Sequence, residues 1–286
     1  GDTVKIVASK DTVVRGNQFS VTVTGRANQA YYIWVKGTSS MDGSTGNQPP
    51  LMAASQEGVV NDPVAGPYPI GAYPYEGGSG KTIKSDVSPQ PSNGVYYYAR
   101  ITTSASGTRT IGFLTGPDTD DKKYTIRVEN VFDGQYKSDE VDVKVEKGTV
   151  TVVASGDQSY FLGQEVLLSG TNSESDYVYL FITGPNLPNN GGFLDSAQGG
   201  PRVSVCGKIC NSVGCSNTNY KLTVADVNDD NTWEYKWQTA NLDIDAGTYT
   251  IYAVSDAYAK DGLSCAQYGT VSVVIRKPFV TAQASQ

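Results

Sequence analysis

Short runs of strand length recur along the whole chain, either alternating apolar and polar residues or apolar throughout. In the first half they lie at 4–9, 19–25, 31–36, 95–103, 108–115, 123–130 and 140–147. In the second half they lie at 149–155, 165–170, 177–184, 220–227, 232–239, 247–255 and 268–277. Gly, Pro, Asn and Asp separate the runs, and no segment repeats apolar residues with a helical period over ten or more positions. The pattern predicts an all-β fold.

The run YYIWVK, which begins at Tyr31, is bulky on both faces. In a strand, Tyr31, Ile33 and Val35 point to one side of the sheet. Tyr32 and Trp34 point to the other side. The matching run YVYLFITG in the second half has the same character. We expect the inner face to build a sandwich core and the outer face to be covered by the insertion that follows the strand, with neighbouring subunits as the second candidate cover.

The two halves of the chain resemble each other. RGNQFSVTVTGRANQAYYIWVKGT at 15–38 parallels LGQEVLLSGTNSESDYVYLFITGP at 162–185, and both end in the aromatic strand. The spacing of the strands in each half is typical of an immunoglobulin-like, Greek-key β-sandwich. The sequence therefore predicts two tandem domains, 1–148 and 149–286.

Each domain carries a long insertion after its aromatic strand, at 37–94 in the first and 184–219 in the second. Structureless loops of more than about fifteen residues are unusual in compact domains, so we expect both to be ordered caps or interaction surfaces. The first insertion is rich in Pro, Gly and Tyr. Tyr68, Tyr73 and Tyr75 would offer wide, rigid contact area, which makes them candidate subunit contacts.

Composition excludes several functions. With 22 basic and 29 acidic residues the net charge is −7, and the absence of a Lys/Arg-rich run argues against a nucleic-acid partner. The chain has no histidine, which rules out a Ser/His/Asp triad, a Cys/His pair and a His-bearing zinc site. A histidine-free glycosidase needs a preferred carboxylate pair, and none stands out. We expect no enzymatic activity.

The four cysteines, Cys206, Cys210, Cys215 and Cys265, all lie in the second half. Their even number in a chain of extracellular character favours disulfides over a four-thiolate zinc site, which would use paired C-x₂-C knuckles. Three pairings are open. We favour Cys206 with Cys210 and Cys215 with Cys265, and bridges between neighbouring subunits are the functional alternative.

A weak calcium candidate lies at Asp226, Asn228 and Asp230, which follow the i, i+2, i+4 spacing with which a calcium loop begins. Asn231 replaces the glycine of an EF-hand and Trp237 replaces its final glutamate. A turn held by Asx hydrogen bonds is therefore the favoured interpretation, and we expect no other cofactor.

The chain resembles the surface-layer glycoproteins of methanogenic archaea, whose ectodomains are built from tandem β-sandwich modules. The resemblance is carried by YYIWVKGTSSMDGSTGNQPPLMAASQEGVVNDP, GPYPIGAYPYEGG, NGVYYYARITTSASGTRTIGFLT and KKYTIRVE. It covers essentially all of residues 10–148 and, less sharply, 149–278. It implies an exported structural protein of the archaeal envelope.

The chain departs from this family in having no Asn-x-Ser/Thr acceptor and no Thr-rich stalk. No apolar run reaches the ~20 residues of a membrane span. These departures favour the subunit of a proteinaceous sheath, with a truncated ectodomain as the competing explanation. The expected function is a self-assembling extracellular array, an S-layer or tubular sheath made from copies of this chain. The alternative is a secreted adhesin or carbohydrate-binding module, with an aromatic face of Tyr31, Trp34, Trp233 and Trp237.

Overall fold

The computed structural model describes residues 3–44, 46–78, 80–89, 96–198 and 223–278. The chain divides into two compact units, unit 1 (residues 1–147) and unit 2 (residues 148–286). The boundary falls next to the one that the internal repeat predicts.

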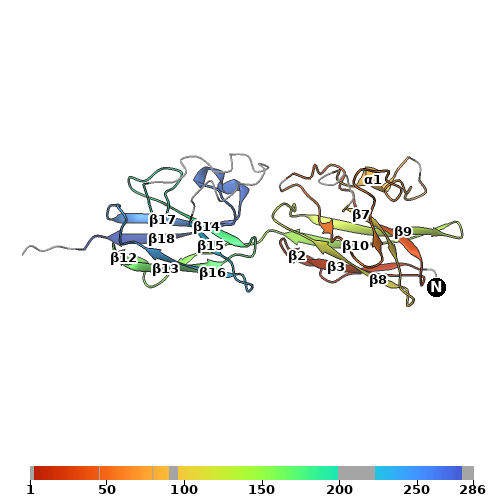
Figure 1. The fold of residues 1–286 in the computed structure, drawn as a ribbon, viewed down its shortest axis with the longest axis horizontal. Coiled ribbons are helices and arrows are strands. Elements are labelled where there is room, and N and C mark those ends of the chain that lie inside the picture. The colour runs from red at the N-terminus through yellow and green to blue at the C-terminus, as the bar shows by residue number, and fades with distance from the viewer. Residues whose placement is uncertain (1–2, 45, 79, 90–95, 199–222, 279–286) are drawn as a thin grey trace, which may run out of the picture. The chain divides into compact units, whose positions relative to one another are not determined.

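Unit 1 consists of two packed sheets (Figure 1). Its elements are β1 (Lys5–Ala8), β2 (Thr12–Val14), β3 (Phe19–Thr24), β4 (Ala30–Lys36), β5 (Leu51–Met52), β6 (Val59–Val60), α1 (Ile83–Asp86), β7 (Tyr98–Thr102), β8 (Thr108–Leu114), β9 (Lys123–Phe132) and β10 (Gln135–Glu146). The smaller sheet has the order β1-β3-β8-β5 and the larger one β2-β10-β9-β4-β7-β6. All neighbours are antiparallel except β2 and β10, which run parallel.

Unit 2 repeats this arrangement. Its elements are β11 (Val153–Ala154), β12 (Ser159–Phe161), β13 (Glu165–Thr171), β14 (Tyr177–Thr183), β15 (Thr223–Asp226), β16 (Thr232–Gln238), β17 (Gly247–Val254), the 3-10 helix η1 (Lys260–Cys265) and β18 (Tyr268–Arg276). The sheets have the orders β11-β13-β16 and β12-β18-β17-β14-β15, and β12 and β18 are again parallel.

The strand order β1-β3-β8 of unit 1 corresponds to β11-β13-β16 of unit 2, and β2-β10-β9-β4-β7 corresponds to β12-β18-β17-β14-β15. This confirms the predicted all-β fold of two immunoglobulin-like sandwiches. Both insertions leave the sheet at the same point, between β4 and β7 in unit 1 and between β14 and β15 in unit 2.

The cores form from the inner faces of the paired sheets. In unit 1 the inner residues of β4 are fully or almost fully buried, namely Tyr31, Ile33 and Val35. In unit 2 the core includes Val178, Leu180 and Ile182 of β14 together with Trp233 and Trp237. Each fully buried large apolar side chain contributes about 1.5–3 kcal/mol, so these alternating positions are the main reason that the strands pair in this register.

The sequence pattern missed the short elements. The strands β2, β5, β6 and β12 span two or three residues each, too few to show a period. The strand predicted over 149–155 is reduced to β11, although Val150 still forms an isolated bridge with Asn172.

Candidate functional site

The insertion of unit 1 covers the outer face of the larger sheet around β4 and β7. Trp34 of β4 is 0% exposed although it points away from the sandwich core. Its ring lies 5.4 Å from that of Tyr75, and its Nε1 donates a hydrogen bond of 2.9 Å to Oδ2 of Asp86. Both partners belong to the insertion, and α1, which ends at Asp86, lies on the opposite side of the larger sheet from β3 and β8 (Figure 1). The expected cover of the strand is confirmed.

A second hydrophobic cluster therefore exists outside the sandwich core, and we call it the outer-face cluster. Its buried members are Trp34, Ile70, Tyr75, Ile83, Val87, Tyr97 and Tyr98, and Tyr32, Leu51 and Tyr73 pack against it. The rings of Tyr32 and Tyr73 stack at 4.0 Å with an interplanar angle of 14°. Aromatic pairs of this kind add about 0.5–1.5 kcal/mol beyond the area that they bury.

A buried carboxylate holds one turn of the insertion against β7. Asp62 is 4% exposed and accepts hydrogen bonds from the backbone N–H groups of Ile70 (3.0 Å) and Gly71 (2.9 Å) and from the hydroxyl of Tyr98 (2.8 Å). Gly71 has to be a glycine because a Cβ there would lie 2.7 Å from the Tyr98 oxygen. Burial, and after it the hydrogen bond to Asp62, raises the pKa of Tyr98, so the hydroxyl stays a donor.

A buried ion pair fastens the next part of the insertion. Glu129 of β9 is 0% exposed, and one of its oxygens accepts hydrogen bonds from Nε (3.0 Å) and Nη2 (2.8 Å) of Arg127. The other oxygen accepts from the Tyr73 hydroxyl (3.0 Å) and the Glu76 backbone N–H (3.1 Å). A buried carboxylate is tolerated only when it is paired and fully hydrogen-bonded, which both oxygens of Glu129 are.

Further charges extend this pair across the sheet surface. Glu140 of β10 accepts hydrogen bonds from Lys36 (2.8 Å) and Arg127 (2.9 Å), and Glu76 lies 3.8 Å and 3.7 Å from the same two cations. The strand register brings Arg127 and Glu140 together, because Arg127 of β9 lies directly between its cross-strand neighbours Trp34 of β4 and Glu140 of β10. We call Lys36, Glu76, Arg127, Glu129 and Glu140 the ionic cluster.

Electrostatics in the ionic cluster follow from this packing. Burial alone would raise the pKa of Glu140, but the hydrogen bonds from Lys36 and Arg127 lower it below its ordinary value. Burial alone would likewise lower the pKa of Arg127, and its hydrogen bonds to Glu129 and Glu140 raise it. Burial, and after it the negative charge of Glu129, raises the pKa of Tyr73. The charged forms of Glu140 and Arg127 are thus the stable ones at neutral pH.

Unit 2 covers the same face with a different set of residues. Phe181 of β14 is 0% exposed and stacks on Tyr252 at 4.5 Å. It packs with Tyr179, Val254, Ala257 and Leu263, and Phe193, Val224 and Ala266 lie against them. Part of this cover comes from the insertion and part from η1. In Figure 1, η1 lies on the same side of the larger sheet as the insertion.

The predicted contact tyrosines are largely used inside unit 1. Tyr75 is buried against Trp34, so its assignment as a contact with a neighbouring subunit is corrected. Tyr73 is half-buried and bonded to Glu129. Tyr68 is also half-buried, with Nζ of Lys84 3.1 Å above its ring and its hydroxyl donating to the carbonyl of Val64. The sequence did not reveal this because bulky aromatics suit an internal cover as well as an interface.

Two other predicted sites fall partly or wholly on described residues. Cys265 ends η1 and is disulfide-bonded. Cys206, Cys210 and Cys215 lie outside the described residues, so the pairing stays a prediction.

The calcium candidate forms a tight turn between β15 and β16. Oδ1 of Asp230 accepts hydrogen bonds from the backbone N–H (3.1 Å) and hydroxyl (2.5 Å) of Thr232, and the amide of Asn228 donates to the same hydroxyl (3.1 Å). These bonds lower the pKa of Asp230 and match the favoured Asx-turn interpretation. No group of three or more Cys, Asp or Glu side chains that could hold a metal occurs among the described residues. Calcium binding stays a prediction.

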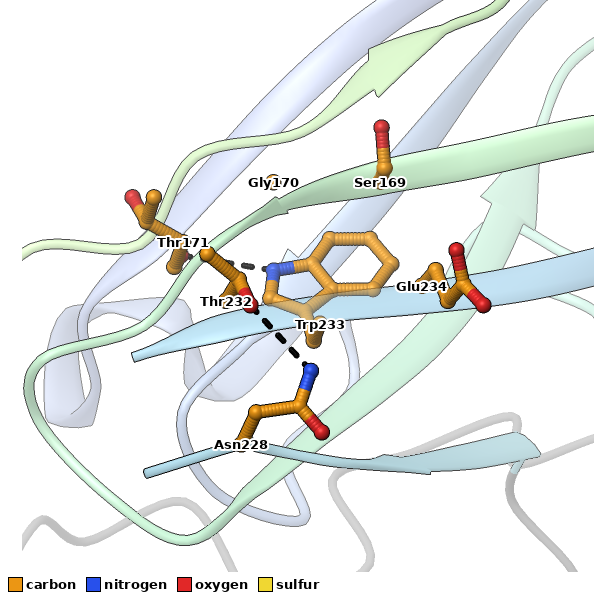
Figure 2. Close-up of a pocket in the computed structure, with 7 residues that line it drawn as sticks. All are labelled: Ser169, Gly170, Thr171, Asn228, Thr232, Trp233 and Glu234. Carbon is orange, nitrogen blue, oxygen red and sulfur yellow. Dashed lines mark hydrogen bonds between the residues drawn. The ribbon is translucent and has the colours of Figure 1, made fainter. Parts of the chain in front are cut away.

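The aromatic sugar-binding face is not present in this form. Tyr31, Trp34, Trp233 and Trp237 are each no more than 1% exposed, so none offers a ring face to a ligand. A shallow pocket does adjoin Trp233, lined by Ser169, Gly170, Thr171, Asn228, Thr232 and Glu234 (Figure 2). The indole lies beneath it and donates from Nε1 to the carbonyl of Thr171 at 3.3 Å. Trp233 is therefore part of the sandwich core and offers no ring face on which a sugar could stack.

Comparisons with known proteins give no family. No protein-family model matches the chain, and neither does any curated protein. Among the described residues, no helix is long and apolar enough to cross a membrane.

Solved structures with the same type of fold are similar only remotely. A tetra-tandem repeat from the extending region of a large adhesion protein is 13% identical, with a TM-score of 0.30, over 96% of this chain and 49% of that one. A membrane-anchored protein from Corynebacterium diphtheriae is 12% identical, with a TM-score of 0.36, over 98% and 54%. The C-terminal domain of the Streptococcus pyogenes antigen I/II-family protein AspA is 10% identical, with a TM-score of 0.33, over 96% and 99%. This chain spans about half the length of the first two, and at these scores the similarity carries no argument about function.

The burial of all three tryptophans of the chain predicts that its fluorescence resists quenching. Acrylamide titration of the native protein should give a Stern–Volmer slope far below that of the same protein in denaturant, where every indole is accessible. A native slope close to the denatured one would show that a tryptophan is exposed. Repeating the titration on Trp34→Phe would then tell whether the insertion leaves Trp34 uncovered.

The bonds at Glu129 predict energetic coupling between the insertion and the sheet. Glu129→Gln should lower the free energy of unfolding by about 3 kcal/mol because it leaves the Arg127 guanidinium without its buried partner. Tyr73→Phe should cost about 1 kcal/mol, and the double variant should cost less than the sum by about 0.5–1.5 kcal/mol, measured by denaturant unfolding. Tyr136→Phe, at an exposed tyrosine of β10, is the matched control. Strict additivity would mean that the two groups do not interact.

The lowered pKa of Glu140 predicts an acid-sensitive contribution to stability. Its ordinary value is 4.5 and its folded value is lower, so the stabilisation is complete above pH 4.5 and is lost as pH falls through the folded pKa. The carboxylate is partly exposed, which limits the effect to about 1 kcal/mol or less. The melting temperatures of the native chain and of Glu140→Gln should therefore converge as pH falls below 4.5. A difference that stays constant down to about pH 3 would contradict this assignment.

Proposed function

We propose that this chain is a structural subunit of a self-assembling, extracellular cell-surface array, an S-layer or tubular sheath of the kind that methanogenic archaea carry. The observation that carries the proposal is that the aromatic strand of each unit is covered on both faces, by the opposite sheet and by further segments of the same unit. Each unit buries the outer side chains of its aromatic strand, β4 or β14, beneath its own chain, and in unit 1 buried polar groups fasten that cover. The cover makes each module thicker and more rigid, which suits a load-bearing wall.

The described surface offers little that suits catalysis or sugar binding. A pocket beside β16 is shallow and is lined by Trp233, one carboxylate and otherwise small or polar residues. All three tryptophans are buried and used for packing. We therefore propose a mechanical function without enzymatic activity, in which the wall protects the cell, maintains its shape and passes small solutes. The partners in this proposal are copies of the same chain.

Head-to-tail contacts between identical subunits that do not close on themselves give sheets, tubes or filaments. Strand edges and exposed loops can supply such contacts, and an edge strand can add a strand from a neighbour. The net charge of −7 would make the pores of such a wall mildly selective for cations, an effect that salt screens.

The proposal predicts assembly that depends on concentration. Negative-stain images of the purified full chain at rising concentration should show regular sheets, tubes or rings. Parallel samples with added calcium and with a chelator test the calcium candidate at Asp226, Asn228 and Asp230. Particles that stay single at every concentration, together with binding on a glycan array, would instead support the secreted adhesin or carbohydrate-binding module.

A further inference from the structure

One edge of the smaller sheet in unit 2 is open among the described residues. The strand β16 is the last in the order β11-β13-β16 and pairs only with β13. The backbone N–H of Asn172 donates to the carbonyl of Asn231 at 2.7 Å, so the odd-numbered residues 231–237 direct their backbone groups to β13. The even-numbered residues direct theirs away from it. No described residue forms a backbone hydrogen bond with Glu234, Lys236 or Gln238 on that outer side.

Unit 1 closes the corresponding edge with its own chain. There β8 takes the place of β16, and β5 pairs with its end at Phe113 and Leu114. The side-chain amide of Gln56 pairs with both backbone groups of Gly112: it accepts a hydrogen bond from the N–H (2.6 Å) and donates one to the carbonyl (3.0 Å). The same fold therefore accepts an added partner on this edge, and unit 2 lacks one in the part of the chain that the structure describes.

The side chains on the open edge of β16 are self-complementary. Glu234 and Lys236 are both exposed, point to the same face of the sheet and form no ion pair with another described residue. When a second β16 is laid antiparallel with Tyr235 opposite its own copy, Glu234 of each strand faces Lys236 of the other. The outward backbone groups of these two residues then form the close hydrogen-bonded pairs of an antiparallel ladder. Directly opposed charges of unlike sign stabilise such a pair.

We propose that β16 pairs with β16 of a second copy of this chain across a two-fold axis, which joins two three-stranded sheets into one continuous sheet of six strands. The contact rests on the proposed function, because a two-fold pair closes on itself and supplies one of the contacts that an array needs. Charged residues on edge strands often prevent pairing. Here Glu234 and Lys236 carry opposite charges two residues apart. Each charge therefore faces its opposite only when the second copy is antiparallel with Tyr235 opposite Tyr235.

Charge reversal tests the register. The full chain should show concentration-dependent dimers in analytical ultracentrifugation. Glu234→Lys and Lys236→Glu each place like charges opposite each other and should weaken the dimer by about tenfold or more. The double variant Glu234→Lys with Lys236→Glu restores the matches and should dimerise like the native chain. Lys123→Glu, at an exposed position of the central strand β9, is the matched control and should change nothing.

Zero-length cross-linking identifies the contact directly. A carbodiimide joins a carboxylate to an amine, so a mixture of ¹⁴N- and ¹⁵N-labelled chains should yield a mixed-isotope link between Glu234 and Lys236. Single reversals that dimerise as tightly as the native chain, or a native chain that stays monomeric and yields no mixed link, would overturn the proposal. Arrays that form equally well with either single reversal would reject this contact and leave the array function standing. Dimers that form without any arrays would support this contact and reject the array function.

Discussion

A strand with large apolar side chains on both faces needs two covers, and this requirement shapes both units. In unit 1 the inner face of β4 meets the other sheet, as in any sandwich. Its outer face carries Tyr32 and Trp34, which water would solvate poorly. The insertion between β4 and β7 supplies the second cover, which turns a two-layer sandwich into a three-layer one on that side. The insertion is thus a structural part of the domain.

Polar groups fix where this cover lies. A hydrophobic contact is not directional, so the outer-face cluster alone would allow the insertion to slide. Asp62 and Glu129 remove that freedom, because both are buried, and movement of the insertion would break the bond from Tyr98 to Asp62 and the bond from Tyr73 to Glu129. Leaving a buried polar group without its hydrogen-bond partner costs about 1–3 kcal/mol, which makes one arrangement better than its neighbours. Packing supplies the stability of the cover, and the carboxylates supply its specificity.

The repeat shows which features belong to the fold and which to one copy. Strand order, the parallel edge strand (β2 or β12) and the site of the insertion are shared. The covers differ: unit 1 uses aromatic rings and ions, whereas unit 2 uses Phe181, Tyr252 and the 3-10 helix η1. The closure of the smaller sheet differs too, since β5 and Gln56 protect β8 while β16 keeps an open side among the described residues. One architecture therefore presents two unlike edges, which is useful to a subunit that has to make unlike contacts.

The sequence by itself determined the all-β class, the two repeated modules and the strands long enough to alternate, because these depend on local periodicity and on self-similarity. It also indicated that β4 needs a second cover. Only the tertiary structure decided which residues provide it: Tyr75 lies against Trp34, and Glu129 meets Tyr73, 56 residues away along the chain. An aromatic in a Pro-rich loop, or an acid in an alternating strand, has the same local pattern whether it faces solvent, a neighbour or its own insertion. The distinction depends on contacts distant in sequence, which no local pattern contains.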